Sequence, residues 1–249
     1  GFAHVNLLDI VAVTSNLASL AKHHWTFFTY MFVHEGFFHI LFNMLILYWL
    51  GLIFCEYLGS RKIVPVYIMG GFAGALLYIG AYNLIPAFAD AVAYSRLIGA
   101  SAGVIAVMVA IATLVPNYSI PLLLLGPVKL KYIAVFSIVI YLISIPEGNA
   151  GGNIAHLGGA ILGFFYTRSI QKGKNPGAWI EKIGDMFSGR GRRMKVVRSP
   201  KKAKSSFFGG TVTQKEKAVD EILDKISKSG YSSLSEEEKD ILFRASKRK

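Results

Sequence analysis

The chain has 249 residues, of which 53% are hydrophobic and only 17% are charged, and its mean hydropathy is +0.45. Because soluble domains are typically about one quarter charged, this composition excludes an ordinary cytosolic enzyme. The net charge of +12 is concentrated in residues 168–249, which hold 21 Lys and Arg against 10 Asp and Glu, whereas residues 1–167 hold six and five. This pattern predicts a membrane body followed by a basic, water-facing region. The single cysteine, Cys55, excludes a disulfide framework and a cysteine-based zinc site.

Five apolar segments follow residues 1–24, a region whose pattern predicts no definite element. A bilayer-spanning helix needs roughly 20 apolar residues. The five candidate spans are Phe37–Tyr57, Ile63–Ile85, Leu97–Val115, Tyr132–Ile145 and Asn153–Ile170. The fourth is short and needs support from neighbouring helices or a thinned bilayer. Residues 119–126, which include Pro121, are predicted to form an interfacial loop.

Basic residues in the short loops orient these spans. The loop after the first span holds Arg61 and Lys62, and the loop after the third holds two lysines. On the opposite side, Arg96 is the only basic residue of the loops near 86–96 and 146–152. The positive-inside rule therefore places the basic loops and the C-terminal region in the cytoplasm. Either the chain starts outside, or a further span precedes this sequence, and the initial Gly favours the second interpretation.

Residues 172–212 are predicted to form a basic interfacial helix and a flexible linker. Residues 176–187 indicate a short amphipathic helix with Asn175 as its N-cap, able to lie in the membrane interface. Residues 188–212 are rich in Lys, Arg, Ser and Gly, a composition typical of flexible linkers.

Residues 213–249 are predicted to form a two-helix hairpin in the cytoplasm. Two capping-box patterns begin at Thr213 and Ser235, and Gly230 is a helix stop between them. Apolar residues recur at helical spacing in both segments. We expect a cytoplasmic binding module with a partner of its own, and the alternative is a solvated basic tail.

Polar residues recur at one depth of the membrane body. The first, third and fifth spans run in the same direction, so their N-terminal turns lie at the same level. These turns carry His39 and Asn43, Ser101 between Gly99 and Gly103, and His156 followed by Gly159 and Gly163. An ionisable side chain inside a membrane indicates a functional site by default. The alternative is a hydrogen-bonded pair that only joins two helices.

The residue types at this level suit nucleophilic catalysis. Serine is a weak nucleophile unless a base takes its proton, and His156 can act as that base for Ser101. The fifth span contains no Asp or Glu, so the pattern favours a Ser/His dyad over a triad. His39 and Asn43 are suitable donors to an oxyanion. Because the Gly-x-Ser-x-Gly pattern opens a membrane helix instead of following a strand, an α/β-hydrolase is excluded.

Three motifs resemble those of the rhomboid family of intramembrane serine proteases. Residues 34–43 are similar to its His-x4-His-x3-Asn signature, and residues 99–101 are similar to its Gly-x-Ser nucleophile motif. Residues 155–163 are similar to its Ala-His-x2-Gly-x3-Gly helix. The resemblance extends from Trp25 to Tyr166, with the motifs in the family's order and spacing.

The resemblance implies an all-α polytopic membrane protein with a rhomboid-like helical bundle. Residues 1–171 would be a protease domain with five spans, lacking the family's first helix upstream. A Ser101/His156 dyad would lie in a water-filled cavity, with Asn43, His39 and the Ser101 amide as oxyanion donors and His34 as a structural residue. Gly99, Gly159 and Gly163 would support the site, without a cofactor or metal.

The same resemblance implies partners and a location. Substrates would be single-span membrane proteins within the lipid bilayer, cut near helix-destabilising residues, and no nucleic acid is expected. The C-terminal helices resemble an appendage of one bacterial branch, which implies a bacterial inner membrane and a cytoplasmic C-terminus.

Four residues depart from the family pattern or bear on the cavity. Ala102 replaces the usual Gly after the nucleophile and is expected to tighten the cavity. Ile105 replaces a Tyr that stacks on the catalytic His, so another group or packing must orient His156. Thr26 replaces the Arg of a Trp-Arg motif, and Asn153 is expected to line the cavity.

Two further functions remain open from the sequence. One is an inactive rhomboid-like protein that only binds transmembrane helices, although such proteins typically lose Ser or His. The other is a small transporter. Transporters place polar sites near the bilayer midplane, whereas the polar cluster of this chain is predicted near one face of the membrane.

Overall fold

The computed structural model describes residues 7–122, 125–187 and 213–246. Packing divides the chain into two units, Gly1–Arg193 and Met194–Lys249. The main helices of the first unit are α4 (Phe37–Leu58), α5 (Ile63–Leu84), α6 (Ser101–Leu114), α7 (Leu130–Ile143), α8 (Ala150–Gln171) and α9 (Ala178–Phe187). Short helical turns η2 (Ser60–Lys62) and η3 (Pro86–Ala91) flank α5.

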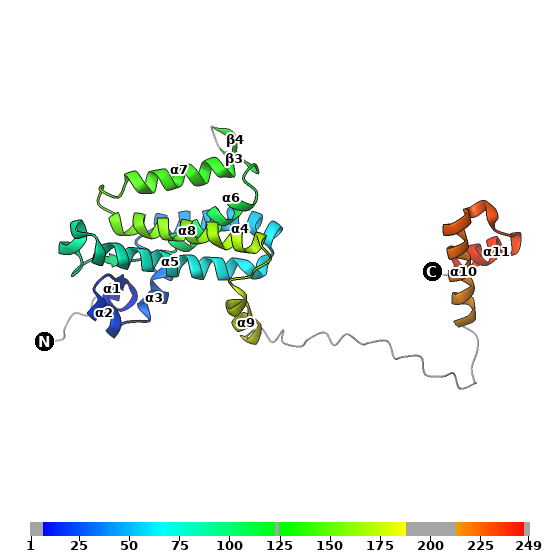
Figure 1. The fold of residues 1–249 in the computed structure, drawn as a ribbon, viewed down its shortest axis with the longest axis horizontal. Helices are drawn as coiled ribbons and strands as arrows, with labels where there is room; N and C mark the ends of the chain where they lie inside the picture. The colour runs from blue at the N-terminus through cyan, green and yellow to red at the C-terminus, as the bar shows by residue number, and fades with distance from the viewer. Residues whose placement is uncertain (1–6, 123–124, 188–212, 247–249) are drawn as a thin grey trace. The chain divides into compact units, whose positions relative to one another are not determined.

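Three helices form the centre of the first unit. Helices α5 and α8 lie side by side, and α6 packs against both (Figure 1). Helix α7 runs along α8 on the side away from α5 (Figure 1). Every residue of α6 from Ala102 to Ala112 is buried, so protein and not lipid surrounds this helix. Its 14 residues span only about 21 Å, which is tolerable because neighbouring helices enclose it.

The all-α fold class predicted from the sequence is confirmed, and each of the five predicted spans contains a helix. Residues 37–58 and 60–84 are long and apolar enough to cross a membrane, and α6 and α7 are shorter apolar helices. Helix α8 is long but less apolar, because its first half carries glycines, Asn153 and His156.

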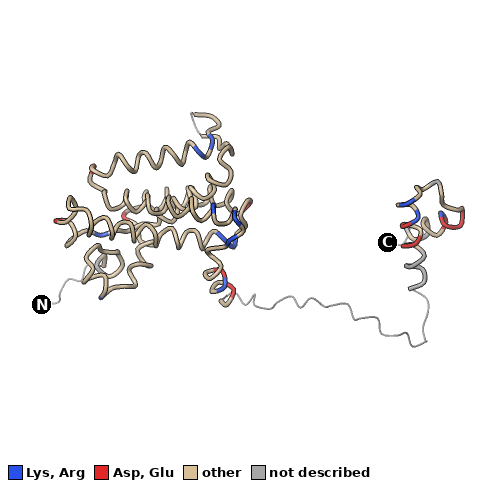
Figure 2. Tube along the Cα trace, in the orientation of Figure 1, with Lys and Arg blue, Asp and Glu red and all other residues tan. Residues whose placement is uncertain are grey.

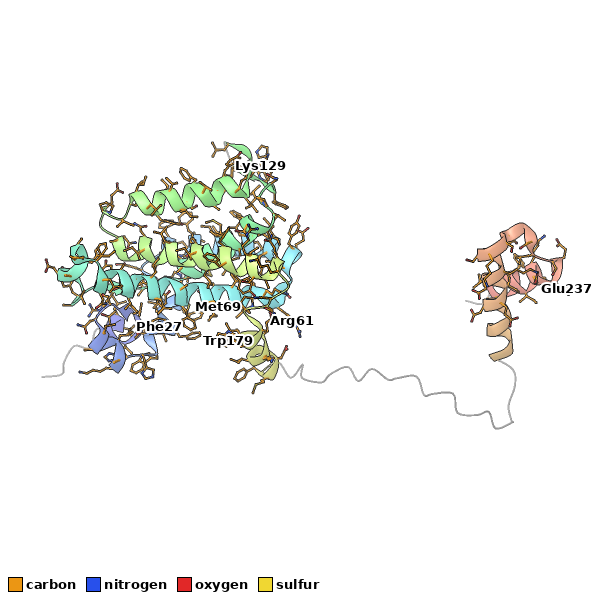
Figure 3. The ribbon with its side chains drawn as sticks, viewed as in Figure 1. Phe27, Arg61, Met69, Lys129, Trp179 and Glu237 are labelled. Atoms are coloured by element: carbon orange, nitrogen blue, oxygen red, sulfur yellow. The ribbon has the colours of Figure 1, made fainter. Side chains whose placement is uncertain are left out.

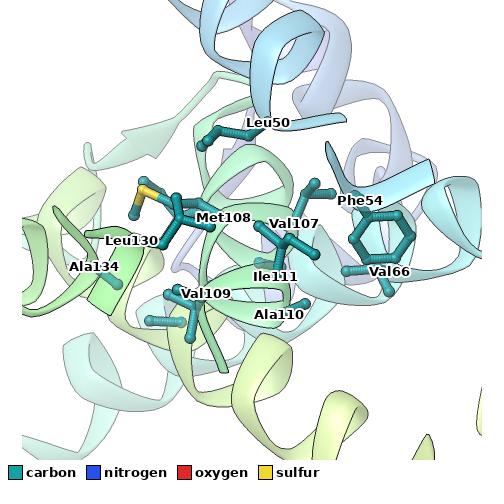
Figure 4. Close-up of a cluster of buried hydrophobic side chains, with 14 of the residues drawn as sticks. Leu50, Phe54, Val66, Val107, Met108, Val109, Ala110, Ile111, Leu130 and Ala134 are labelled. Carbon is teal, nitrogen blue, oxygen red and sulfur yellow. The ribbon is translucent and has the colours of Figure 1, made fainter. Parts of the chain in front are cut away.

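The apolar side chains divide between a packed interior and an exposed exterior. Phe54, Val66 and Ile111 are completely buried where α4, α5 and α6 meet (Figure 4). In contrast, large apolar side chains such as Phe38 and Phe136 are more than 60% exposed. An exterior of this kind fits contact with lipid and not with water.

The third predicted span begins later than the sequence indicated. Residues 97–100 are not helical: Arg96–Leu97 form β2 and pair antiparallel with Val13–Thr14, which form β1. Gly99 has φ +123°, a left-handed conformation that interrupts a helix, and its N–H donates to Tyr30 O at 2.9 Å. The helix therefore starts at Ser101 itself.

Within residues 119–126, predicted to be a loop, described residues belong to two paired antiparallel strands. The strands are β3 (Ser119–Leu122) and β4 (Gly126–Lys129), and Pro121 faces Pro127 across the ladder. A two-stranded ribbon has only edge strands, where Pro can occupy positions that donate no ladder hydrogen bond.

The N-terminal region, unassigned from the sequence, packs beside α5 (Figure 1). It comprises α1 (Leu7–Val11), β1, α2 (Leu17–Lys22), α3 (Thr26–Thr29) and η1 (Tyr30–Phe32). Trp25 Nε1–H donates to Ile10 O at 2.8 Å, and the Tyr30 hydroxyl donates to Gly71 O at 2.5 Å. The first bond lies within the N-terminal region and the second attaches the region to α5, whereas the Tyr30–Gly99 bond attaches it to the segment that precedes Ser101.

Lys and Arg gather at the end of the first unit from which α9 leaves (Figure 2). There Arg61 pairs with Asp185 of α9 at 3.1 Å, and the apolar side chain of Trp179 is exposed (Figure 3). The N-cap predicted at Asn175 is wrong. The helix begins at Ala178, and the Glu181 amide donates to Gly177 O at 3.1 Å, so Gly177 precedes the first turn. A side chain at Gly177 would collide with Pro65 and the Tyr166 hydroxyl.

The second unit contains α10 (Thr213–Ser229), η4 (Tyr231–Ser233) and α11 (Glu236–Ser246). Ile222 and Leu234 are buried between the helices. At the start of α11 the Ser235 amide donates to Glu238 Oε2 at 2.8 Å, and the Glu238 amide donates to Ser235 Oγ at 3.3 Å. This is the reciprocal bonding of a capping box. The linker predicted at 188–212 lies outside the described residues.

Candidate active site

Ser101 and His156 are hydrogen-bonded although 55 residues separate them. Nε2 of His156 lies 2.6 Å from Oγ of Ser101. The Ser101 side chain stands on the first residue of α6, and His156 lies on the second turn of α8. With Nε2 unprotonated, the hydroxyl donates to the imidazole, which is the arrangement needed for proton transfer from a serine nucleophile to a base.

Small residues bring α6 and α8 into backbone contact. A Cβ at Gly159 would collide with Ala102 O, and a Cβ at Gly163 would collide with Ala106 O. One turn further, the Thr167 hydroxyl donates to Ala110 O at 2.9 Å. These three contacts recur every four residues along both helices and fix the distance between Ser101 and His156. Sequence reasoning missed Thr167, although its four-residue spacing from Gly163 was a usable signal.

A cavity of about 750 Å³ opens onto the Ser101 hydroxyl. The side chains that line it come from α4, α6, α7 and α8 and from the loops before α4, α6 and α8. Those that bear on the chemistry are His39, Asn43, Ser101, Ile105, Tyr141 and His156. The four polar residues predicted for the site therefore share one cavity.

Two side chains of α4 bring donors to this cavity. Asn43 Nδ2–H donates to His39 O at 2.8 Å, which leaves its second N–H uncommitted by that bond. His39 Nε2 and Ser101 Oγ both lie close to Gly99, because a Cβ at that residue would be 3.1 Å from the first atom and 3.5 Å from the second. The imidazole of His39 therefore stands close to the nucleophile. The Ser101 amide, in the first turn of α6, has no acceptor within its own helix.

His34 lies behind His39 and does not line the cavity. The two rings are 5.0 Å apart between centroids and nearly perpendicular, at 79°. Desolvation, with a smaller effect of His39, lowers the pKa of His34 and favours the neutral imidazole. This position fits a residue that supports His39 from the loop before α4.

Two expectations about the cavity are wrong. The Ala102 methyl does not enter the cavity but points toward α5, where it would lie 2.6 Å from a Cβ at Gly74. One residue along a helix turns the side chain by about 100°, so Ala102 faces away from the side that Ser101 presents. Asn153 does not line the cavity either. Its side chain is buried, and its Nδ2–H donates to Ser144 O at 2.8 Å.

The other two departures from the family pattern are Thr26 and Ile105. The buried Thr26 hydroxyl donates to His23 O at 2.7 Å in the turn before α3. At Ile105 no aromatic ring is available, and the ring that packs on His156 comes instead from Tyr141 of α7. Within the described residues, no group of His, Cys, Asp and Glu is placed to hold a metal ion.

Comparison with known proteins accords with this geometry. Residues 21–172 match the profile of the Rhomboid domain. The chain is 28% identical over 158 residues to RHOMBOID-like protein 12, mitochondrial, of Arabidopsis thaliana. That alignment covers 60% of this chain and 47% of the relative, so the chain spans about half of the relative's length. Residues 212–248 match a family of unknown function (DUF6576).

The protein belongs to the rhomboid family, because the matched domain covers more than half of the chain. The Rhomboid domain together with the apolar helices indicates a membrane protein.

Proposed function

We propose that the protein is an intramembrane serine endopeptidase that cleaves transmembrane segments of membrane proteins. The observation that carries the proposal is the 2.6 Å bond between Ser101 Oγ and His156 Nε2 in a cavity that also holds Asn43 and His39. Ser101 attacks the scissile carbonyl while His156 accepts its proton. His156 then returns the proton to the leaving amine, and water hydrolyses the acyl-enzyme.

The oxyanion is stabilised by three groups in this proposal. The Ser101 amide lies at the N-terminus of α6, where the helix dipole favours negative charge. Asn43 and His39 supply side-chain donors from α4. Donors of this kind are often the largest electrostatic contribution to acyl transfer. His34, Gly99, Gly159 and Gly163 act through packing and not through contact with substrate.

A cleavage assay tests the proposal. The purified protein in liposomes is mixed with a single-span reporter that carries helix-destabilising residues near its outer end. Wild-type protein should cut the reporter, whereas Ser101→Ala and His156→Ala should each abolish cleavage while retaining the thermal stability of the wild type. If the wild type binds the reporter without cutting it, the protein is an inactive rhomboid-like helix binder. Undiminished cleavage by either variant would exclude the dyad.

For location, we propose a bacterial inner membrane with the active site near the outer face and residues 172–249 in the cytoplasm. The basic end of the first unit, which includes Arg61, supports this orientation. A Ser205→Cys variant that lacks Cys55 should resist an impermeant thiol reagent in intact cells. Labelling from outside would reverse the orientation. The hairpin in residues 213–249 is proposed to bind a cytoplasmic partner.

A further inference from the structure

His156 lacks the partner that usually orients a catalytic imidazole. Its Nε2 is bonded to Ser101, but its buried Nδ1 has no hydrogen-bond partner in the part of the chain that the structure describes. A hydrogen bond at the second nitrogen normally fixes the tautomer and the orientation of such a ring. Here another contact has to hold the imidazole toward Ser101.

The Tyr141 ring makes that contact. It packs on the His156 imidazole with 4.4 Å between ring centroids and 60° between ring planes. Tyr141 is half-buried and lines the same cavity as Ser101. On α6, the residue one turn after Ser101 is Ile105, which also lines the cavity but offers no ring. The aromatic partner of the base therefore comes from α7 and not from the helix of the nucleophile.

A hydrogen bond keeps this part of α7 against α8. Ser144 is three residues after Tyr141, and Asn153 is three residues before His156. Asn153 Nδ2–H donates to Ser144 O at 2.8 Å, where α7 ends. The two helices thus meet at two adjacent levels, first through the ring pair and then through this bond. The bond fixes the end of α7 and so keeps the Tyr141 ring over the imidazole.

We infer that Tyr141 is the positioning residue of His156 and that α7 is thereby part of the active centre, although it carries no catalytic residue. The inference rests on the proposed Ser101/His156 dyad. The ring, and not the hydroxyl, performs this role, because the contact is between ring faces and edges. Without the ring, the imidazole can rotate away from Ser101. A displacement of about 1 Å at a reacting group can lower the rate about 100-fold.

The test compares four variants in the liposome cleavage assay. Tyr141→Ala and Tyr141→Leu remove the ring, and the Leu variant retains most of the volume in case the Ala variant fails to fold. Tyr141→Phe retains the ring. Tyr132→Ala is the matched control, because Tyr132 lies on the same helix but is 58% exposed. The readouts are kcat, KM and the rate of inactivation by a fluorophosphonate, which reports nucleophile activation without a protein substrate.

We expect kcat and the inactivation rate to fall together in Tyr141→Ala and Tyr141→Leu, by about 10- to 100-fold, with KM little changed. Tyr141→Phe and Tyr132→Ala should stay close to the wild type. Wild-type kcat in Tyr141→Leu, or an equal loss in Tyr141→Phe, would overturn the inference. His156→Ala distinguishes this failure from failure of the dyad, because an active His156→Ala variant would refute the dyad itself.

Discussion

A single methyl group added to Gly159 should separate α8 from α6 and disable the proposed dyad. The new Cβ would collide with the carbonyl oxygen of Ala102 and lie 2.9 Å from its carbonyl carbon. Backbone atoms inside a helix cannot rotate away as a side chain can. Relieving the carbon contact alone takes about 0.6 Å, because carbon contacts are comfortable at about 3.5 Å. The overlap with the Ala102 oxygen is larger, so α8 must move by roughly 1 Å, and His156 moves with it.

The expected loss follows from this displacement. A shift of about 1 Å between reacting groups lowers the rate about 100-fold, which corresponds to about 2.7 kcal/mol in the activation free energy. Overpacking should also lower the free energy of unfolding by about 1–3 kcal/mol. The assay is reporter cleavage in liposomes, with kcat measured at saturating reporter and folding followed by thermal unfolding.

Gly80→Ala is the matched control for this experiment. Gly80 also lies within a membrane helix, but a Cβ there would have no atom within 4 Å apart from its chain neighbours and the nearby backbone of its own helix. Because Ala favours a helix over Gly by about 1 kcal/mol, this variant should be at least as stable as the wild type and fully active. If Gly159→Ala retains the kcat of Gly80→Ala, close packing of α8 on α6 does not set the geometry of the dyad.

Asn43→Ala should lower kcat by about 100-fold with little change in KM, measured by steady-state cleavage; an unchanged kcat would make Asn43 a packing residue. Deletion of residues 213–249 should leave reporter cleavage intact, and loss of activity in a folded truncation would contradict this. Hydrogen bonds from Lys225 and then from the Ser235 amide lower the pKa of Glu238. The bonds of ionised Glu238 therefore stabilise the folded hairpin fully above the ordinary glutamate pKa, and this stabilisation is lost as the pH falls through the lowered pKa of Glu238. The NMR shift of the Ser235 amide should accordingly titrate below the pH range of an ordinary glutamate.

The sequence predicted the helices and the depth shared by the polar residues His39, Asn43, Ser101 and His156, because both depend on local patterns. Apolar segments of sufficient length predict membrane helices, and residues in corresponding turns of parallel spans lie at one depth. The pairing of Ser101 with His156 follows once α6 and α8 adjoin, and the glycines of α8 indicated that contact. The residue types alone also favoured donors such as Asn43.

Contacts between distant segments could not be predicted in the same way. Tyr141 looks like any aromatic residue of an apolar helix, and only the packing of α7 on α8 places it over His156. The pairing of β2 with β1 delays the start of α6 to Ser101, and no residue near Ser101 indicates that pairing. The Ala102 side chain is turned by about 100° from that of Ser101, and only the packing of α6 on α5 shows which neighbour the methyl meets on that side.

Covalent labelling tests whether Ser101 is a nucleophile activated by His156. The wild-type protein is treated with a fluorophosphonate probe, and the modified residue is located by mass spectrometry of the digested protein. We predict a single adduct on Ser101, no adduct in Ser101→Ala, and a strongly reduced labelling rate in His156→Ala. Absence of labelling in the folded wild type, or an adduct on another residue, would rule out Ser101 as the activated nucleophile.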